Sequence, residues 1–118
     1  MEITIVPEPC VGEEAKFEGD VVVTLPTYPQ RIRYAKQCGL KVGSDGKVDV
    51  NGDHLEALAV LADLTKGHIQ KVNIKKKDSG EVIDSVELLY VDSDCDPIVT
   101  DLALKLTHGF KPTKNLSA

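Results

Sequence analysis

The chain has 118 residues, the size of one small domain with a single hydrophobic core. Hydrophobic residues make up 42% of the chain and charged residues 28%, a globular balance that excludes wholesale disorder. The formal net charge of -5 and an aromatic content of 4% also argue against a nucleic-acid surface, which needs positive charge and stacking rings. We therefore expect a small α+β domain without a nucleic-acid partner.

The N-terminus and the cysteines indicate a cytoplasmic protein. The opening sequence MEITIVPEPCVGEE is acidic and proline-broken, whereas a secretory signal needs a basic start and an apolar run. No stretch reaches the roughly 18 apolar residues of a membrane span, so we expect no membrane partner. Cys10, Cys38 and Cys95 are odd in number and lack Cys-x-x-Cys spacing, which favours reduced thiols.

The first third of the chain predicts a strand, a partly ordered segment, a second strand and a helix. Ile3 and Ile5 begin a strand, and the rest of residues 1–19 is expected to be only partly ordered. The β-branched run 21–25 predicts a strand that stops at Pro26. A helix over 28–38 follows, with Thr27 as its cap and Gly39 as its end.

That helix has a predicted apolar stripe and a basic outer surface. Ile32, Ala35 and Cys38, with Tyr28 before them, recur at helical spacing and predict a buried stripe. The remaining surface carries Arg31, Arg33 and Lys36.

The middle of the chain predicts a second helix after an irregular segment. Residues 40–53 contain three glycines and predict a loop or a small irregular hairpin. Asp53 caps a helix over 54–67 that Gly67 ends. Its apolar face consists of Leu55, Leu58, Leu61, Ala62 and Thr65, widened by Leu64.

The second half predicts a β-hairpin and two further helices. Residues 70–75 form a strand with Gln70, Val72 and Ile74 on one face, and a turn at 78–80 leads to a partner strand at 82–83. Asp84 or Ser85 caps a short helix over 86–90, and Asp96-Pro97 opens the last helix, which Gly109 closes. Residues 110–118 are expected to form a flexible tail. We predict one α+β domain over 1–118, with about four helices, a β-hairpin and short N-terminal strands.

The motifs for chemistry are incomplete. Asp92, Asp94 and Asp96 read like the start of a calcium loop, but Pro97 and Ala103 stand where such a loop needs Gly and Glu. We therefore interpret these aspartates as helix caps. His54, His68 and His108 each lie at a predicted helix edge without metal-ligand spacing. With no nucleophile elbow and no phosphate-binding loop, we expect neither an enzyme nor a cofactor.

Lys71 and the run 75–77 make the predicted hairpin basic, which has two interpretations. Lysines on a strand protect an exposed sheet edge from pairing with another sheet. The alternative is an acidic partner or nucleic acid, against which the net charge counts.

Two segments resemble a known family. FEGDVVVTLPTYPQRIRYAKQCG is similar to the opening of phage tail assembly chaperones, where a short strand and a Pro/Thr-marked cap precede a basic amphipathic helix. VNIKKKDSGEVIDSVELLYVDSDCDPIVTDLALKLTHGFKPTKN resembles their second half. In that family a strand pair leads to a short sequence pattern, which is matched here by Ser85, Leu88, Leu89, Tyr90 and Asp92. A last helix then ends in a Gly-aromatic pair, here Gly109 and Phe110. The resemblance spans roughly residues 17–112 in element order and pattern.

The resemblance implies a non-enzymatic protein of the host cytoplasm that is absent from the finished virion. Such chaperones bind the tape measure protein, and in some cases the tail tube protein, and they often form homo-oligomers. Many are also made as a longer frameshifted product, and the tail from Phe110 is compatible with such an extension. A structural virion component, such as a tail terminator or head–tail connector protein, is the alternative. A small bacterial regulatory or antitoxin-like module is a third interpretation.

If the family function holds, the first helix is the expected partner-binding surface. Our candidates are Tyr28, Arg31, Ile32 and Tyr34, because Tyr and Arg are enriched in interface hot spots. They would cover an amphipathic helix of the partner by packing it in a groove. Tyr28 and Ile32 are equally open to interpretation as core residues. We expect Arg31→Glu combined with Tyr34→Ala to weaken partner binding with thermal stability nearly unchanged.

Overall fold

A computed structural model describes residues 2–38, 41–42, 48–49 and 55–108, which form an α+β fold and confirm the predicted class. The helices are α1 (Tyr28–Gln37), α2 (Leu55–Thr65), α3 (Val86–Val91) and α4 (Asp96–His108). The strands are β1 (Glu2–Ile5), β2 (Phe17–Thr24), β3 (Lys41–Val42), β4 (Val48–Asp49), β5 (Ile69–Lys76) and β6 (Val82–Ile83). Short 3-10 turns form η1 (Glu8–Cys10), η2 (Lys66–His68) and η3 (Ser93–Cys95).

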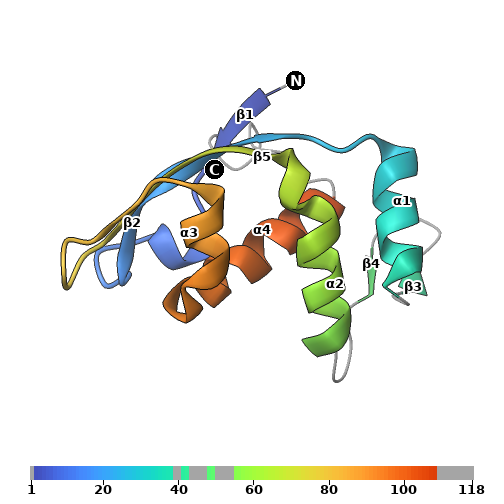
Figure 1. Ribbon diagram of the computed structural model, residues 1–118. Coiled ribbons are helices and arrows are strands. Elements are labelled where there is room, and N and C mark those ends of the chain that lie inside the picture. Colours follow the sequence, from blue (N-terminus) through green and yellow to red (C-terminus); the bar gives the residue numbers. More distant parts are fainter. Residues whose placement is uncertain (1, 39–40, 43–47, 50–54, 109–118) are drawn as a thin grey trace.

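An antiparallel sheet forms the main layer, with strand order β1-β2-β5-β6. Figure 1 shows α3 and α4 on one side of this sheet, with α2 and α1 beyond the ends of β5 and β2. The opposite side is polar, and there Lys75 lies opposite Glu18 and the Asn73 amide donates to Asp20 across 3.1 Å. The small pair β3–β4 matches the irregular hairpin expected within 40–53.

The main core fills the space between the sheet and the two helices that cover it. The fully buried side chains include Val21, Val72 and Ile83 from the sheet and Leu89, Ile98 and Leu102 from α3 and α4. Burying each of these side chains contributes about 1.5–3 kcal/mol relative to leaving it in water. The apolar residues that alternate along the strands and those that form stripes on α3 and α4 therefore produce the main core.

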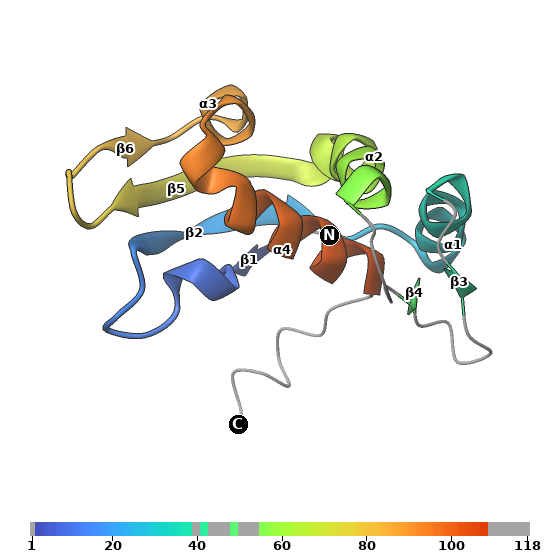
Figure 2. The same ribbon diagram turned by 90° about the horizontal axis from the view of Figure 1, so that it is seen from below.

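A second, smaller core joins α1, α2 and α4. Its buried members are Ala35, Leu61, Ala62 and Ala103, and three of these four are alanines. Small side chains let helices approach closely, so α1 and α2 pack against α4 and the three form a helical lobe, in which α4 also covers the sheet (Figure 2). Tyr34, Cys38 and Leu104 pack around it.

A β-bulge changes one expectation for β5. The register pairs Val22 with Lys71 and then Val23 with Ile69, so Gln70 is the extra residue. Because the bulge shifts the alternation, Ile69 is buried and Gln70 is exposed. The prediction that Gln70 shares a face with Val72 and Ile74 was therefore wrong, while Val72 and Ile74 are buried as predicted.

The N-terminal segment is built into the fold. Residues 1–19 were expected to be partly ordered beyond Ile5, and they contain β1, η1 and the start of β2. The Glu8 amide donates to Asp101 of α4 at 2.9 Å, and the Lys105 ammonium donates to the Val6 carbonyl at 3.3 Å. The second strand begins at Phe17 rather than at residue 21, because Phe17–Asp20 pair with β5.

Local capping signals predicted the helix starts well. Thr27 accepts from the Gln30 amide while the Gln30 side chain accepts from the Thr27 amide, which forms a capping box for α1. Ser85 caps α3 by accepting from the Leu88 amide at 3.1 Å. The expected roles of Gly39, Asp53, Gly109 and residues 110–118 lie outside the described residues, as does His54.

Candidate partner-binding surface

The first helix carries all four predicted partner-binding residues. Pro26 ends the extended segment after β2, and the capping box at Thr27 starts α1 at Tyr28. The helix sequence YPQRIRYAKQ contains three basic residues and no acidic one. This surface is therefore positively charged although the whole chain is negative.

The exposed Tyr28 and the half-buried Arg31 form an aromatic–cation pair. The Tyr28 side chain is 57% exposed, and the Arg31 guanidinium lies 5.8 Å from its ring centroid. Arg31 also donates from Nη1 to the Pro26 carbonyl at 2.8 Å, which fixes its direction. The interpretation of Tyr28 as a core residue was wrong, because its position in the first turn places the ring outside the helical lobe.

Ile32 and Tyr34 are both half-buried, but they lie on different sides of α1. At about 100° per residue, Ile32 is about 40° around the helix from Tyr28, whereas Tyr34 is about 120° away. Tyr34 packs against the second core, and its hydroxyl lies 2.9 Å from Nε2 of His68. The helix thus brings Tyr28, Arg31 and Ile32 together and directs Tyr34 inward.

His68 connects α1 to the sheet. Thr24 Oγ1 lies 3.2 Å from His68 Nδ1 and donates to the His68 carbonyl at 3.4 Å. Since the Thr24 proton is used there, Nδ1–H donates to Thr24 and Nε2 accepts from Tyr34. Burial lowers the pKa of His68 from its ordinary value of 6.5, while the hydrogen bond to Thr24 opposes that change. No local sequence pattern predicts this contact, because Tyr34 and His68 are 34 positions apart.

The basic hairpin is paired within the chain. Lys76 lies 2.8 Å from Asp92, 3.1 Å from Asp94 and 3.5 Å from Glu81. Lys75 lies 4.0 Å from Glu18, and the Lys77 ammonium donates to the carbonyls of Gly12 and Glu13. The edge-protection interpretation was wrong at Lys75, because β6 pairs with β5 there.

Within the aspartate run, Asp92 is a helix cap as predicted, whereas Asp94 lies inside η3 and Asp96 is the first residue of α4. Asp92 accepts from the Asp94 amide at 3.0 Å and caps η3. The hydrogen bond from Lys76 lowers the pKa of Asp92, and the pKa of Lys76 is raised chiefly by its bond to Asp92. The cluster holds the hairpin against η3.

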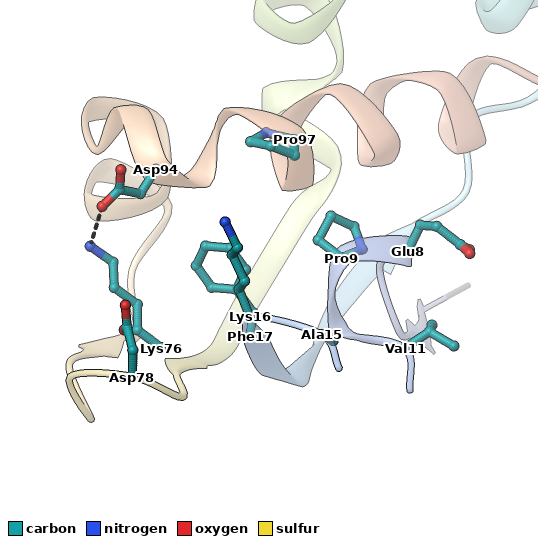
Figure 3. A pocket seen from close by; sticks show the side chains of 10 residues that line it. All are labelled: Glu8, Pro9, Val11, Ala15, Lys16, Phe17, Lys76, Asp78, Asp94 and Pro97. Carbon is teal, nitrogen blue, oxygen red and sulfur yellow. Dashed lines mark hydrogen bonds and ion pairs between the residues drawn. The ribbon is translucent and has the colours of Figure 1, made fainter. Parts of the chain in front are cut away.

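A cavity of about 450 Å³ lies beside this cluster, between the N-terminal segment, the hairpin and the start of α4 (Figure 3). Its apolar wall includes Pro9, Phe17 and Pro97, and Lys76 and Asp94 meet at its edge. Lys76 is neutralised there by its own carboxylates, and the other charged side chains of the lining are Glu8, Lys16 and Asp78.

Two kinds of feature are absent from the described part of the chain, namely clusters of metal-ligand residues and membrane-spanning helices. Across residues 2–38, 41–42, 48–49 and 55–108, no group of three His, Cys, Asp or Glu side chains converges as metal ligands do. Within those same ranges, no helix has both the length and the apolar character that crossing a bilayer requires.

Comparison with known proteins gave no relative. No family model, no curated protein and no solved structure matches this chain.

Proposed function

We propose that this protein is a non-enzymatic phage tail assembly chaperone, which holds the tape measure protein soluble in the host cytoplasm during tail assembly. The tail tube protein is a second proposed partner, and the chaperone acts as a homo-oligomer. The proposal rests on the resemblance of residues 17–112 to that family, and one observation on α1 supports it.

That observation is the Tyr28–Arg31 pair. An aromatic ring that is 57% exposed, with a guanidinium 5.8 Å from its centroid, is a typical anchor for a protein partner. Ile32 lies on the same side of α1 and adds apolar surface. An amphipathic helix of the partner would cover this side, with an acidic side chain against Arg31.

The test is co-expression with the tape measure protein of the same genome, followed by size exclusion with light scattering. We expect the tape measure protein to become soluble and to co-elute with the chaperone. If it stays insoluble while this chain forms rings or tubes alone, a structural virion component replaces the chaperone.

The surface is tested with matched variants. Tyr28→Ala with Arg31→Glu should weaken binding of the tape measure protein by about thirtyfold or more and so lower its recovery, since hot-spot residues cost about 2 kcal/mol or more. Arg33→Glu makes the same charge change on an exposed part of α1 about 200° around the helix from Arg31, and should leave recovery unchanged. Equal recovery with the double variant would remove α1 from the interface. Tyr34 is left intact because its contact with His68 supports the fold.

A further inference from the structure

A second surface of the helical lobe contains a shallow, largely apolar groove. It lies between α2 and α4, has a volume of about 310 Å³, and is separate from the exposed side of α1. Its lining is largely apolar and consists of Leu58, Ala59, Ala62, Asp96, Val99 and Thr100. Ala59 is exposed, and the neighbouring Val60 is 40% exposed.

Small side chains keep this groove open, and Tyr90 fixes one side of it. Ala59 and Ala62 are one turn apart on α2, so another helix can approach the backbone there closely. The Tyr90 hydroxyl donates to the Ala62 carbonyl at 2.9 Å, and Tyr90 and Val99 both pack against the second core. The groove is therefore held in shape by a hydrogen bond that needs no ligand.

The charges around the groove are mainly acidic. Asp96 lines it, and the exposed Asp63 follows Ala59 by one turn of α2. The α2 sequence LEALAVLADLT contains two acidic residues and no basic one. Lys66 is a neighbouring cation, and its ammonium is held 4.9 Å from the centroid of the Tyr90 ring. This acidic edge contrasts with the wholly basic α1.

We propose that the α2–α4 groove binds a basic amphipathic helix of the partner protein, with its apolar stripe on Leu58, Ala59 and Val99 and its Lys or Arg side chains beside Asp63 and Asp96. That the partner is the tape measure protein rests on the proposed function. The groove's preference for a basic helix rests on Asp96 in its lining and on Asp63 beside it. The partner helix would span about three turns, the length of α2.

The first experiment uses a synthetic probe in place of the partner. A fluorescent amphipathic peptide of repeated Leu and Lys is titrated with the full chain, beside the same peptide with Glu for every Lys. We expect the Leu–Lys peptide to bind and the Leu–Glu peptide to bind at least about tenfold more weakly. Equal binding of the two peptides would overturn the proposal.

Two variants place the binding in the groove. Ala59→Trp fills it and should weaken binding of the Leu–Lys peptide about tenfold. Asp63→Lys should weaken it severalfold and reduce its salt dependence. Glu14→Lys makes the same charge change in an exposed N-terminal turn and should bind as the original chain does. If all three variants bind equally, the peptide binds outside the groove and the proposal is wrong.

The same variants separate this inference from the proposed function. If Ala59→Trp loses the peptide and still captures the tape measure protein, the partner does not use this groove and the proposal fails, while the chaperone function stands. If the groove binds the Leu–Lys peptide selectively and the tape measure protein stays insoluble, the groove stands and the chaperone function fails.

Discussion

The Tyr34 hydroxyl lies 2.9 Å from Nε2 of His68, and this contact joins the middle of α1 to the turn that enters β5. The two rings also meet edge to face, with centroids 5.8 Å apart. Thr24 at the end of β2 holds the other ring nitrogen. The position of the candidate surface on α1 thus depends on His68. Tyr34 is the candidate residue that contacts it.

Because the pKa of His68 is lowered in the fold, stability should depend on pH near 6.5. Above pH 6.5 the ring is neutral in both the folded and the unfolded chain, so its contribution to the free energy of unfolding is fully present. As the pH falls below 6.5 the unfolded chain gains a proton first, and stability is lost until the folded pKa is passed. His68→Gln should flatten this part of the curve, measured by urea unfolding between about pH 5 and 8.

Tyr34→Phe is the matched variant for this contact. It removes the hydroxyl and keeps the ring, so it should cost about 1 kcal/mol at pH 7, the usual value of one hydrogen bond. The histidine still titrates in this variant, so a slope near pH 6.5 should remain. A curve for His68→Gln as steep as that of the original chain would contradict the assignment.

The Lys76 cluster predicts a second dependence on pH, at lower values. The pKa of Asp92 is lowered by its bond to Lys76, so the cluster stabilises the fold above the ordinary value of 3.8. This contribution is lost as the pH falls below about 4. Lys76→Met should lower the unfolding midpoint at pH 7 and make the loss between about pH 4 and 2 smaller.

Lys75→Met is the control for Lys76→Met. Its ion pair with Glu18 spans 4.0 Å between side chains that are 53% and 54% exposed. Exposed pairs contribute little, so this variant should change stability by less than about 0.5 kcal/mol. Equal effects of the two substitutions would show that the cluster at Asp92 adds nothing beyond a surface lysine.

Short-range signals predicted much of the fold, because the physics that sets them is local. Thr27 and Ser85 satisfy amides within one helical turn, and their side chains are capable of this in any fold. The order of the sheet strands was not predicted, because β2 and β5 pair across the whole length of α1 and α2. The bulge at Gln70 was not predicted for the same reason, since it exists only in the pairing of β5 with Val22 and Val23 of β2.

The candidate site was predicted in part. Helical spacing placed Tyr28, Arg31 and Ile32 near one another, but it could not show which turns of α1 the other helices cover. Ala35 lies about 20° around the helix from Tyr28 and about two turns further along it. That later turn is buried against α2 and α4, whereas Tyr28 in the first turn is left in solvent. The α2–α4 groove depends on contact between helices far apart in the chain, so no pattern within one helix predicts it.

The cysteines are predicted to react slowly in the folded protein. All three are free, and burial, followed by the charge of Asp101, raises the pKa of Cys10 to about 11. At pH 8 its thiolate fraction should be about two orders of magnitude below that of an ordinary thiol. Cys95 is fully buried, so it should be modified only after opening of the core.

Iodoacetamide labelling followed by mass spectrometry of the peptides measures how fast each cysteine reacts in the folded protein. In denaturant the three cysteines should react at similar rates, which provides the reference. Native labelling of Cys10 as fast as in denaturant would contradict its packing beside the main core.

Gly19 is predicted to be the most sensitive glycine among the described residues. Its φ of +123° is a conformation that other residues rarely adopt, and a Cβ there would overlap the Asn73 carbonyl oxygen of β5. Relief would require the pairing of β2 with β5 to open, because the obstacle is backbone. Gly19→Ala should therefore cost at least about 2–3 kcal/mol, since strain and a broken ladder add.

Gly80→Ala should cost about 1–2 kcal/mol, because its φ of +76° is strained but the space around it is open. Gly67→Ala meets no atom within 4 Å and should change stability by less than about 0.5 kcal/mol. Urea unfolding of the three variants gives the order, and a Gly19→Ala as stable as Gly67→Ala would disprove the close approach of β2 and β5 at this position.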